Sequence, residues 1–274
     1  MASRPLAGMV TEGLVGLLAL EPIERDLYRT PVVSEQHGRL FGGLVAAQAL
    51  AAAGDTVDPE RVPNSLHGYF LRGGDAALPT VLRVERDLDG RSFSSRRVVA
   101  LQGGEVIFQL SASFQRPREG TENQPEPAPS AGLPDDLEPL VLKLPAFPSV
   151  LARLPDQPFS ESVLPTRFWF KSAEKLADEP LAHACVLTYL SDISTALSAL
   201  RPGPWAGGTS LDHAVWFHRQ IRLDEWVLMD LVPRTASGGR GWYTGTIHSL
   251  DGVLGASLAQ EELFRLGPPA PASG

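Results

Sequence analysis

Cysteine is nearly absent from the 274 residues, because Cys185 is the only one. A single cysteine excludes a disulfide within the chain and is typical of a reducing compartment, so we expect a cytoplasmic protein. The paired cysteines of zinc motifs are also missing, and the six histidines show no HExxH spacing. We therefore expect neither a metal nor a cofactor.

Positive charge is also scarce, since 24 lysines and arginines stand against 32 aspartates and glutamates, giving a formal net charge of −8. Nucleic acids and anionic membranes attract proteins through a positive field, so this balance argues against both partners. No apolar run approaches the roughly 20 residues that cross a bilayer. The nearest, residues 181–200, is interrupted by His183, Asp192 and several hydroxyls.

Two common catalytic motifs are missing as well. The strings GRSFS, GTSLD and GASLA come closest to the GxSxG nucleophile elbow, but each lacks the second glycine. Neither GLVGLL nor GGLVAA is a GxGxxG phosphate-binding loop. What is present is an ordinary globular balance, with 43% hydrophobic and 20% charged residues, which allows a sizeable core.

Proline is concentrated in one region, because 11 of the 24 prolines lie between Pro117 and Pro165. The string RPREGTENQPEPAPSAGLPDD is also acidic and poor in large apolar residues, which predicts a linker without a core of its own. We therefore divide the chain into a first domain, a linker, a second domain and a flexible tail, at residues 1–115, 116–160, 161–267 and 268–274.

The two sides of the linker resemble each other. GRSF at 90–93 corresponds to GRGW at 239–242, and SLHGYFLR at 65–72 corresponds to SLDHAVWFHR at 210–219. Each half has an apolar helix, at 42–57 or 181–200, followed by segments of strand character. The predicted strands are 64–72, 80–88, 92–102, 105–115, 210–220, 226–235, 240–249 and 253–265. A long buried helix wrapped by an antiparallel sheet is an α+β arrangement, here present twice.

Several long strings are similar to the acyl-CoA thioesterase II family. They are GRLFGGLVAAQALAAAGDTV, SLHGYFLRGGD and DGRSFSSRRVVALQGGEVIFQLSASFQ in the first half, and SLDHAVWFHRQIRLDEWVLMD and GVLGASLAQEELFR in the second. The resemblance implies a double hotdog fold and an enzyme that hydrolyses fatty acyl-CoA to free fatty acid and CoA. It also implies a homo-oligomer, because hotdog sheets in the family commonly extend across subunits.

The resemblance further implies a water-activating site. In the family an Asp, a Thr or Ser, and a Gln hold the attacking water, and these roles fall on Asp192 in YLSDIS, Ser210 in GGTSLDH and Gln260 in SLAQEEL. Thr209 is an alternative to Ser210. A carboxylate in a mostly apolar helix is expected to have a raised pKa, which makes it a better base at neutral pH. Without the resemblance, the helical spacing of Thr188, Ser191, Asp192 and Thr195 would favour a polar face of the helix over a catalytic role for Asp192.

Other assignments stay open. Gln48 occupies the place in the first helix that Asp192 has in the second, so we expect one active site per chain, with Gln48 either a helper or a core amide. Candidates for the CoA phosphates are Arg39, Arg72, Arg91, Arg96, Arg97 and Arg240. The alternative functions are an acyl-CoA-binding hotdog protein without useful hydrolysis and a serine hydrolase. Hydration is disfavoured, because Leu197 stands where single-domain hotdog hydratases have a histidine.

Overall fold

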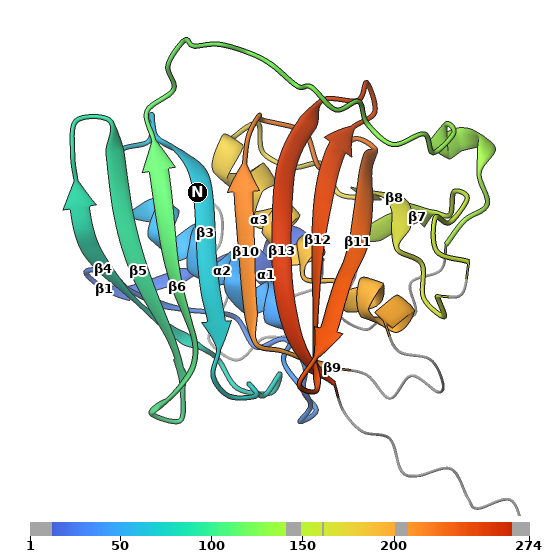
Figure 1. The fold of residues 1–274 in the computed structure, drawn as a ribbon. Helices are drawn as coiled ribbons and strands as arrows, with labels where there is room; N and C mark the ends of the chain where they lie inside the picture. Colours follow the sequence, from blue (N-terminus) through green and yellow to red (C-terminus); the bar gives the residue numbers. More distant parts are fainter. Residues whose placement is uncertain (1–12, 141–148, 161, 201–207, 265–274) are drawn as a thin grey trace, which may run out of the picture.

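The computed structural model describes residues 13–140, 149–160, 162–200 and 208–264. These residues form a large antiparallel sheet, and the helices lie on one side of it (Figure 1). The tail predicted at 268–274 and part of the predicted linker lie outside the described residues.

The first half supplies a long helix and four long strands, whose limits agree with the prediction to within two residues. Its elements are α1 (Leu14–Leu18), β1 (Glu21–Glu24), β2 (Leu27–Arg29), α2 (Gly42–Asp55), β3 (Val62–Phe70), β4 (Val81–Asp89), β5 (Phe93–Gln102) and β6 (Glu105–Gln115). The two short strands β1 and β2 were not predicted.

The second half follows the same order with additional short elements. They are η1 (Pro134–Asp136), β7 (Val150–Arg153), β8 (Arg167–Ser172), α3 (Pro180–Ser191), η2 (Ser194–Leu200), β9 (Gly208–Ser210), β10 (Asp212–Phe217), β11 (Val227–Ser237), β12 (Arg240–Ser249) and β13 (Leu254–Phe264). Strand β7 lies inside the predicted linker, where it pairs with β8 in the sheet. This part of the linker is therefore structured.

The sheet runs without interruption from one half to the other. The strand order is β1-β2-β4-β5-β6-β3-β10-β13-β12-β11-β8-β7, and β9 pairs with β13. The halves meet where β3 and β10 pair antiparallel, with Leu66 opposite Val215 and His67 opposite Ala214. We call this pairing the seam.

Helices α2 and α3 pack against each other behind the sheet (Figure 1). Small residues on α2 allow the close approach: a Cβ added to Gly43 would lie 2.4 Å from the carbonyl oxygen of Tyr189 on α3. Gln48 is buried in α2 and donates to the Leu17 carbonyl at 2.7 Å, so it is a core amide that holds α1. Cys185 is buried in α3, and burial raises the pKa of its thiol to about 12.

The second long helix is shorter than predicted. Instead of continuing to residue 200, α3 ends at Ser191, Asp192 is its C-cap, and the chain resumes as the 3-10 helix η2. Two hydroxyls bond to carbonyl oxygens in the last turns: Thr188 donates to Ala184, and Ser191 donates to Thr188. Such bonds offer the backbone an alternative to continued α-helix.

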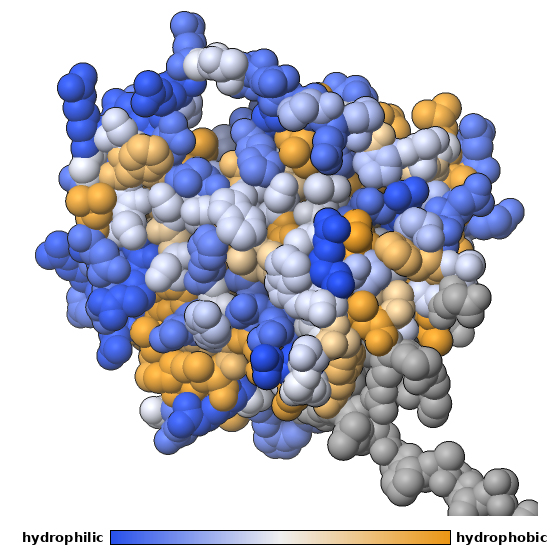
Figure 2. Space-filling model, viewed as in Figure 1, coloured by the Kyte–Doolittle hydropathy of each residue, from blue (hydrophilic) through white to orange (hydrophobic). Residues whose placement is uncertain are grey.

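The outer face of the sheet is covered mainly by polar side chains, with an apolar group at its lower left in Figure 2. Among the described residues, no helix is long and apolar enough to span a membrane.

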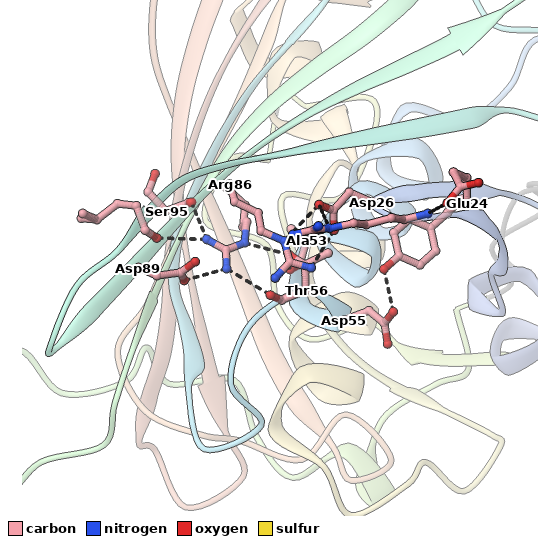
Figure 3. Close-up of polar contacts among 12 residues, drawn as sticks. Glu24, Asp26, Ala53, Asp55, Thr56, Arg86, Asp89 and Ser95 are labelled. Carbon is pink, nitrogen blue, oxygen red and sulfur yellow. Dashed lines mark hydrogen bonds and ion pairs between the residues drawn. The ribbon is translucent and has the colours of Figure 1, made fainter.

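A buried arginine joins the end of α2 to the sheet. Arg96 is 1% exposed, and its guanidinium donates to the hydroxyl and carbonyl of Thr56, to the carbonyls of Leu88 and Ser95, and to the carboxylate of Asp89. Figure 3 shows Thr56, Asp89 and Ser95 converging on this cluster. The positive charge also lies at the end of α2 where the helix dipole favours a cation. These contacts make Arg96 a structural residue.

Replacing Arg96 by Met should destabilise the fold while keeping most of the buried apolar volume. The carbonyl and hydroxyl acceptors would lose their donors in the interior, so we expect the free energy of unfolding to fall by about 2 to 4 kcal/mol. Urea unfolding measures this change. The matched control is Arg97→Ala on the exposed face of the same strand, which loses only surface ion pairs with Glu85 and Asp87 and should cost less than about 1 kcal/mol.

Candidate active site

A cavity of about 560 Å³ lies between the two halves of the chain. The first half contributes the start of α2, the residues after β3 and part of β6, and the second half contributes the end of α3, η2 and β9. Six polar residues of the second half line it, namely Asp192, Ser194, Thr195, Thr209, Ser210 and Glu262. The structure thus brings Asp192 and both candidate hydroxyls to one cavity.

The end of α3 places Asp192 directly against the beginning of α2. The residue is 4% exposed, and a Cβ added to Gly42 would lie 2.7 Å from its Oδ2 atom. The C-terminal end of α3 disfavours a negative charge, whereas the N-terminal end of α2 favours one. Only a residue without a side chain leaves room for the carboxylate at this contact.

The pKa of Asp192 is raised to about 7, chiefly because burial disfavours the charged form. The negative charge of Glu262 acts in the same direction. A hydrogen bond from Gln260, the backbone N–H of Gly43 and the charge of Arg39 lower the pKa. The balance leaves a carboxyl group that exchanges its proton near neutral pH, as a general base requires.

Gln260 lies behind Asp192 in the interior. It is fully buried, its Nε2 amide donates to Asp192 Oδ1, and its Oε1 accepts from the Tyr243 hydroxyl. Residues that line the cavity include Asp192 but not Gln260. The structure therefore brings Gln260 to the carboxylate, in contact with Asp192 rather than with the cavity.

Ser210 is half-buried at the end of β9, where its hydroxyl donates to Glu262 Oε1 at 3.1 Å. The neighbouring candidate, Thr209, lines the same cavity. Because the Ser210 proton is directed to Glu262, the lone pairs of its oxygen are what it can offer to a water.

Sequence reasoning did not single out Glu262, although a signal was present. Successive side chains of a strand alternate between faces, so Glu262 lies on the same face of β13 as Gln260. It is 1% exposed, and burial raises its pKa to about 7. The site therefore contains two buried carboxyl groups.

Of the six arginines predicted as candidates for the CoA phosphates, two line the cavity and four do not. Arg39 and Arg72 are exposed residues that line the cavity. The other four do not line it: they are Arg91, Arg96, Arg97 and Arg240. A cationic rim beside the cavity is thus formed by two residues of the first half.

No histidine of the described ranges lines the cavity. His213 is buried beside Ser191, with Nε2 2.8 Å from its hydroxyl oxygen, and burial lowers the His213 pKa to about 4. It is therefore uncharged at neutral pH. Among the described residues, no group of three His, Cys, Asp or Glu side chains could hold a metal ion.

Comparison with solved structures identifies the fold. A protein with a hot dog fold from Alicyclobacillus acidocaldarius is 20% identical, superposes with a TM-score of 0.75, and covers 92% of this chain and 98% of its own. The acyl-CoA thioesterase II TesB2 from Mycobacterium marinum is 40% identical, with a TM-score of 0.79 and coverage of 94% and 98%. The chain is thus a hotdog-fold protein with a cavity between its halves.

Comparison with other sequences gives the family. Residues 30–115 match the acyl-CoA thioesterase N-terminal domain, and residues 117–264 match the C-terminal domain. Human acyl-coenzyme A thioesterase 8 is 34% identical over 92% of this chain and 88% of its own length. The chain belongs to the acyl-CoA thioesterase family.

Asp192→Asn should stabilise the folded protein at alkaline pH. Burial raises the Asp192 pKa from its ordinary 3.8 to about 7. Between these values the folded state holds a proton that the unfolded state has released, so this group's stability contribution is lost as pH rises toward 7 and above. Asparagine does not ionise. We expect a gain of up to about 4 kcal/mol at pH 8 that vanishes near pH 4.

Urea unfolding at several pH values tests this. The exposed Asp156 provides the control, because Asp156→Asn removes a carboxyl from solvent and should leave the midpoint unchanged at each pH. A destabilised Asp192→Asn protein at pH 8 would contradict the burial of an ionising group at this position.

Proposed function

We propose that this protein is an acyl-CoA thioesterase that hydrolyses fatty acyl-CoA to free fatty acid and CoA by direct attack of water. The observation that carries the proposal is the buried Asp192 carboxyl at the cavity, with a pKa of about 7, in a chain of this family. A group with that proton affinity can take a proton from water and release it again at neutral pH.

The chemical step needs an ionised Asp192. Its carboxylate takes a proton from the water while the water oxygen forms a bond to the thioester carbon, and the C–S bond breaks as the tetrahedral intermediate collapses. CoA leaves as the thiolate, and the proton held by Asp192 passes to its sulfur or to solvent, which restores the carboxylate. Gln260 acts on this water through Asp192, whose Oδ1 it holds, and Ser210 accepts a hydrogen of the water at its oxygen. Thr209 remains the alternative hydroxyl.

The start of α2 supplies donors for the thioester oxygen. The first N–H groups of a helix have no partner within the helix, and the helix dipole concentrates positive potential there. Phe41, at the N-cap, provides no side-chain hydrogen bond to them. Gly42 lines the cavity. An oxyanion that develops beside Gly42 would be stabilised by these fixed dipoles.

The lining of the cavity suits the two ends of the substrate. Exposed guanidinium groups at the rim, Arg39 and Arg72, suit the CoA phosphates. Apolar walls from Phe41, Val45 and Phe70 suit the acyl chain beside the thioester.

The organisation of the chain belongs to the same proposal. The order of elements supports two hotdog repeats, at 1–115 and 161–267, each with a long central helix, separated by a linker at 116–160 and followed by a tail at 268–274. We also propose that the protein is a homo-oligomer of the cytoplasm that binds neither nucleic acid nor membranes.

Thiol release from acyl-CoA should depend on Asp192. The native chain is expected to release thiol, with kcat/KM rising with pH and levelling above about 7, because the base must be ionised. Asp192→Asn should lower kcat by ~10², the scale for losing a general base. Binding of acyl-CoA without thiol release by the native chain would instead favour an acyl-CoA-binding protein. A covalent acyl adduct accumulating during turnover would contradict direct attack by water.

Arg72→Ala should weaken binding of the phosphate-bearing end alone. We expect KM for acyl-CoA to rise about tenfold with kcat nearly unchanged, as for the loss of a contact made equally in ground and transition states. The matched substrate is an acyl-pantetheine, which lacks the phosphates and should show an unchanged KM. Arg97→Ala, away from the cavity, is the control variant. An equal rise of KM for acyl-CoA and for acyl-pantetheine would show that Arg72 does not bind the phosphates.

A further inference from the structure

Strand β13 presents two polar residues toward the site, and the proposed reaction accounts for only one of them. Gln260 and Glu262 are on the same face, 0% and 1% exposed, on the strand that also carries the buried Leu258. Keeping a carboxyl group in such a place is costly unless it is ionised against specific donors or holds its proton. An apolar residue would fill the position at lower cost, so the carboxyl calls for a functional explanation.

The geometry around Glu262 is tightly defined. Its Oε1 accepts the hydroxyl of Ser210, which lies opposite it in the β9–β13 pair. Its Oε2 lies against Gly208, where an added Cβ would come within 2.2 Å. The carboxyl is therefore held between β9 and the cavity that Asp192 also lines.

The groups facing Glu262 come from several elements. Burial raises the pKa of Glu262 to about 7, while the hydroxyls of Ser194 and Ser210 and the charge of Arg39 lower it. On β12, burial and the negative charge of Glu262 hold the pKa of Tyr243 well above its ordinary value. Tyr243 thus keeps its proton, and Arg39 is the cation that acts on Glu262.

We propose that Glu262 is a positioning residue for the attacking water, acting through the Ser210 hydroxyl and through its charge beside Asp192; this rests on the hydrolysis proposed above. Because the Ser210 proton is donated to Glu262, the Ser210 oxygen accepts one hydrogen of the water. Asp192 accepts the other. A lone pair of the water oxygen is then left to face the thioester carbon.

The charge of Glu262 has a second consequence. A neighbouring negative charge raises the pKa of Asp192, and a more basic carboxylate takes a proton from water more readily. Glu262 therefore does two separable things: it sets the direction of the Ser210 hydroxyl, and it increases the basicity of Asp192.

Two substitutions separate the two effects. Glu262→Gln retains an oxygen that accepts from Ser210 but removes the charge. The rise of kcat/KM with pH, its acid limb, should therefore move to lower pH by roughly half a unit or more. The value of kcat/KM at high pH, its plateau, should stay within about threefold of wild type. Glu262→Asp retains the charge but draws the carboxyl away from Ser210, so the limb should stay while the plateau falls roughly tenfold. The control is Glu261→Gln, on the other face of β13 and paired with Arg240, which should change neither.

The outcomes distinguish this proposal from the one on which it rests. If the native chain releases no thiol, the proposed hydrolysis fails and this role fails with it. If the native chain is active and the Glu262→Gln profile superimposes on it, only the role of Glu262 is overturned. A uniform loss of activity in both Glu262 variants that follows a loss of stability in urea, with no movement of the limb, also overturns it, because packing alone would produce that result.

Discussion

A carboxylate can be held at the Asp192 position because the N-terminal end of α2 faces it and Gln260 donates to it. The close approach of α2 to Asp192 depends on small residues at the start of α2. Glycine is required at Gly42 and Gly43, since a side chain at either would collide with Asp192 or with the backbone of α3.

The seam between β3 and β10 determines where that contact lies. Because the sheet is continuous, α2 from the first half and α3 from the second lie side by side, and the cavity opens where the end of one approaches the start of the other. The apolar walls and the cationic rim come largely from the first half, whereas the carboxyl groups come from the second. Neither half contains a complete set of groups for the proposed reaction.

Much of the fold and of the candidate site could be predicted from residue patterns, and the predictions that were wrong or missing have physical causes. Alternating apolar residues with Gly-containing turns identified the long strands, because those strands are buried on one face. The apolar run after Asp192 continues in 3-10 form, which composition does not distinguish from α-helix. Glu262 shares a face with Gln260, but its burial depends on β9 lying alongside. Likewise, Arg39 and Arg72 differ from the other arginines only in their tertiary position.

The seam also bears on how the chain folds. It pairs Leu66 with Val215, which are 149 residues apart in sequence. Closing it therefore carries a large loss of chain entropy and should follow the folding of each half. Until then, β3 and β10 each present an open row of backbone donors and acceptors. Pairing between two chains satisfies these backbone groups as well as pairing within one chain does. Dilution during refolding therefore favours closure of the seam within one chain, and a high concentration of folding intermediates favours strand exchange between chains.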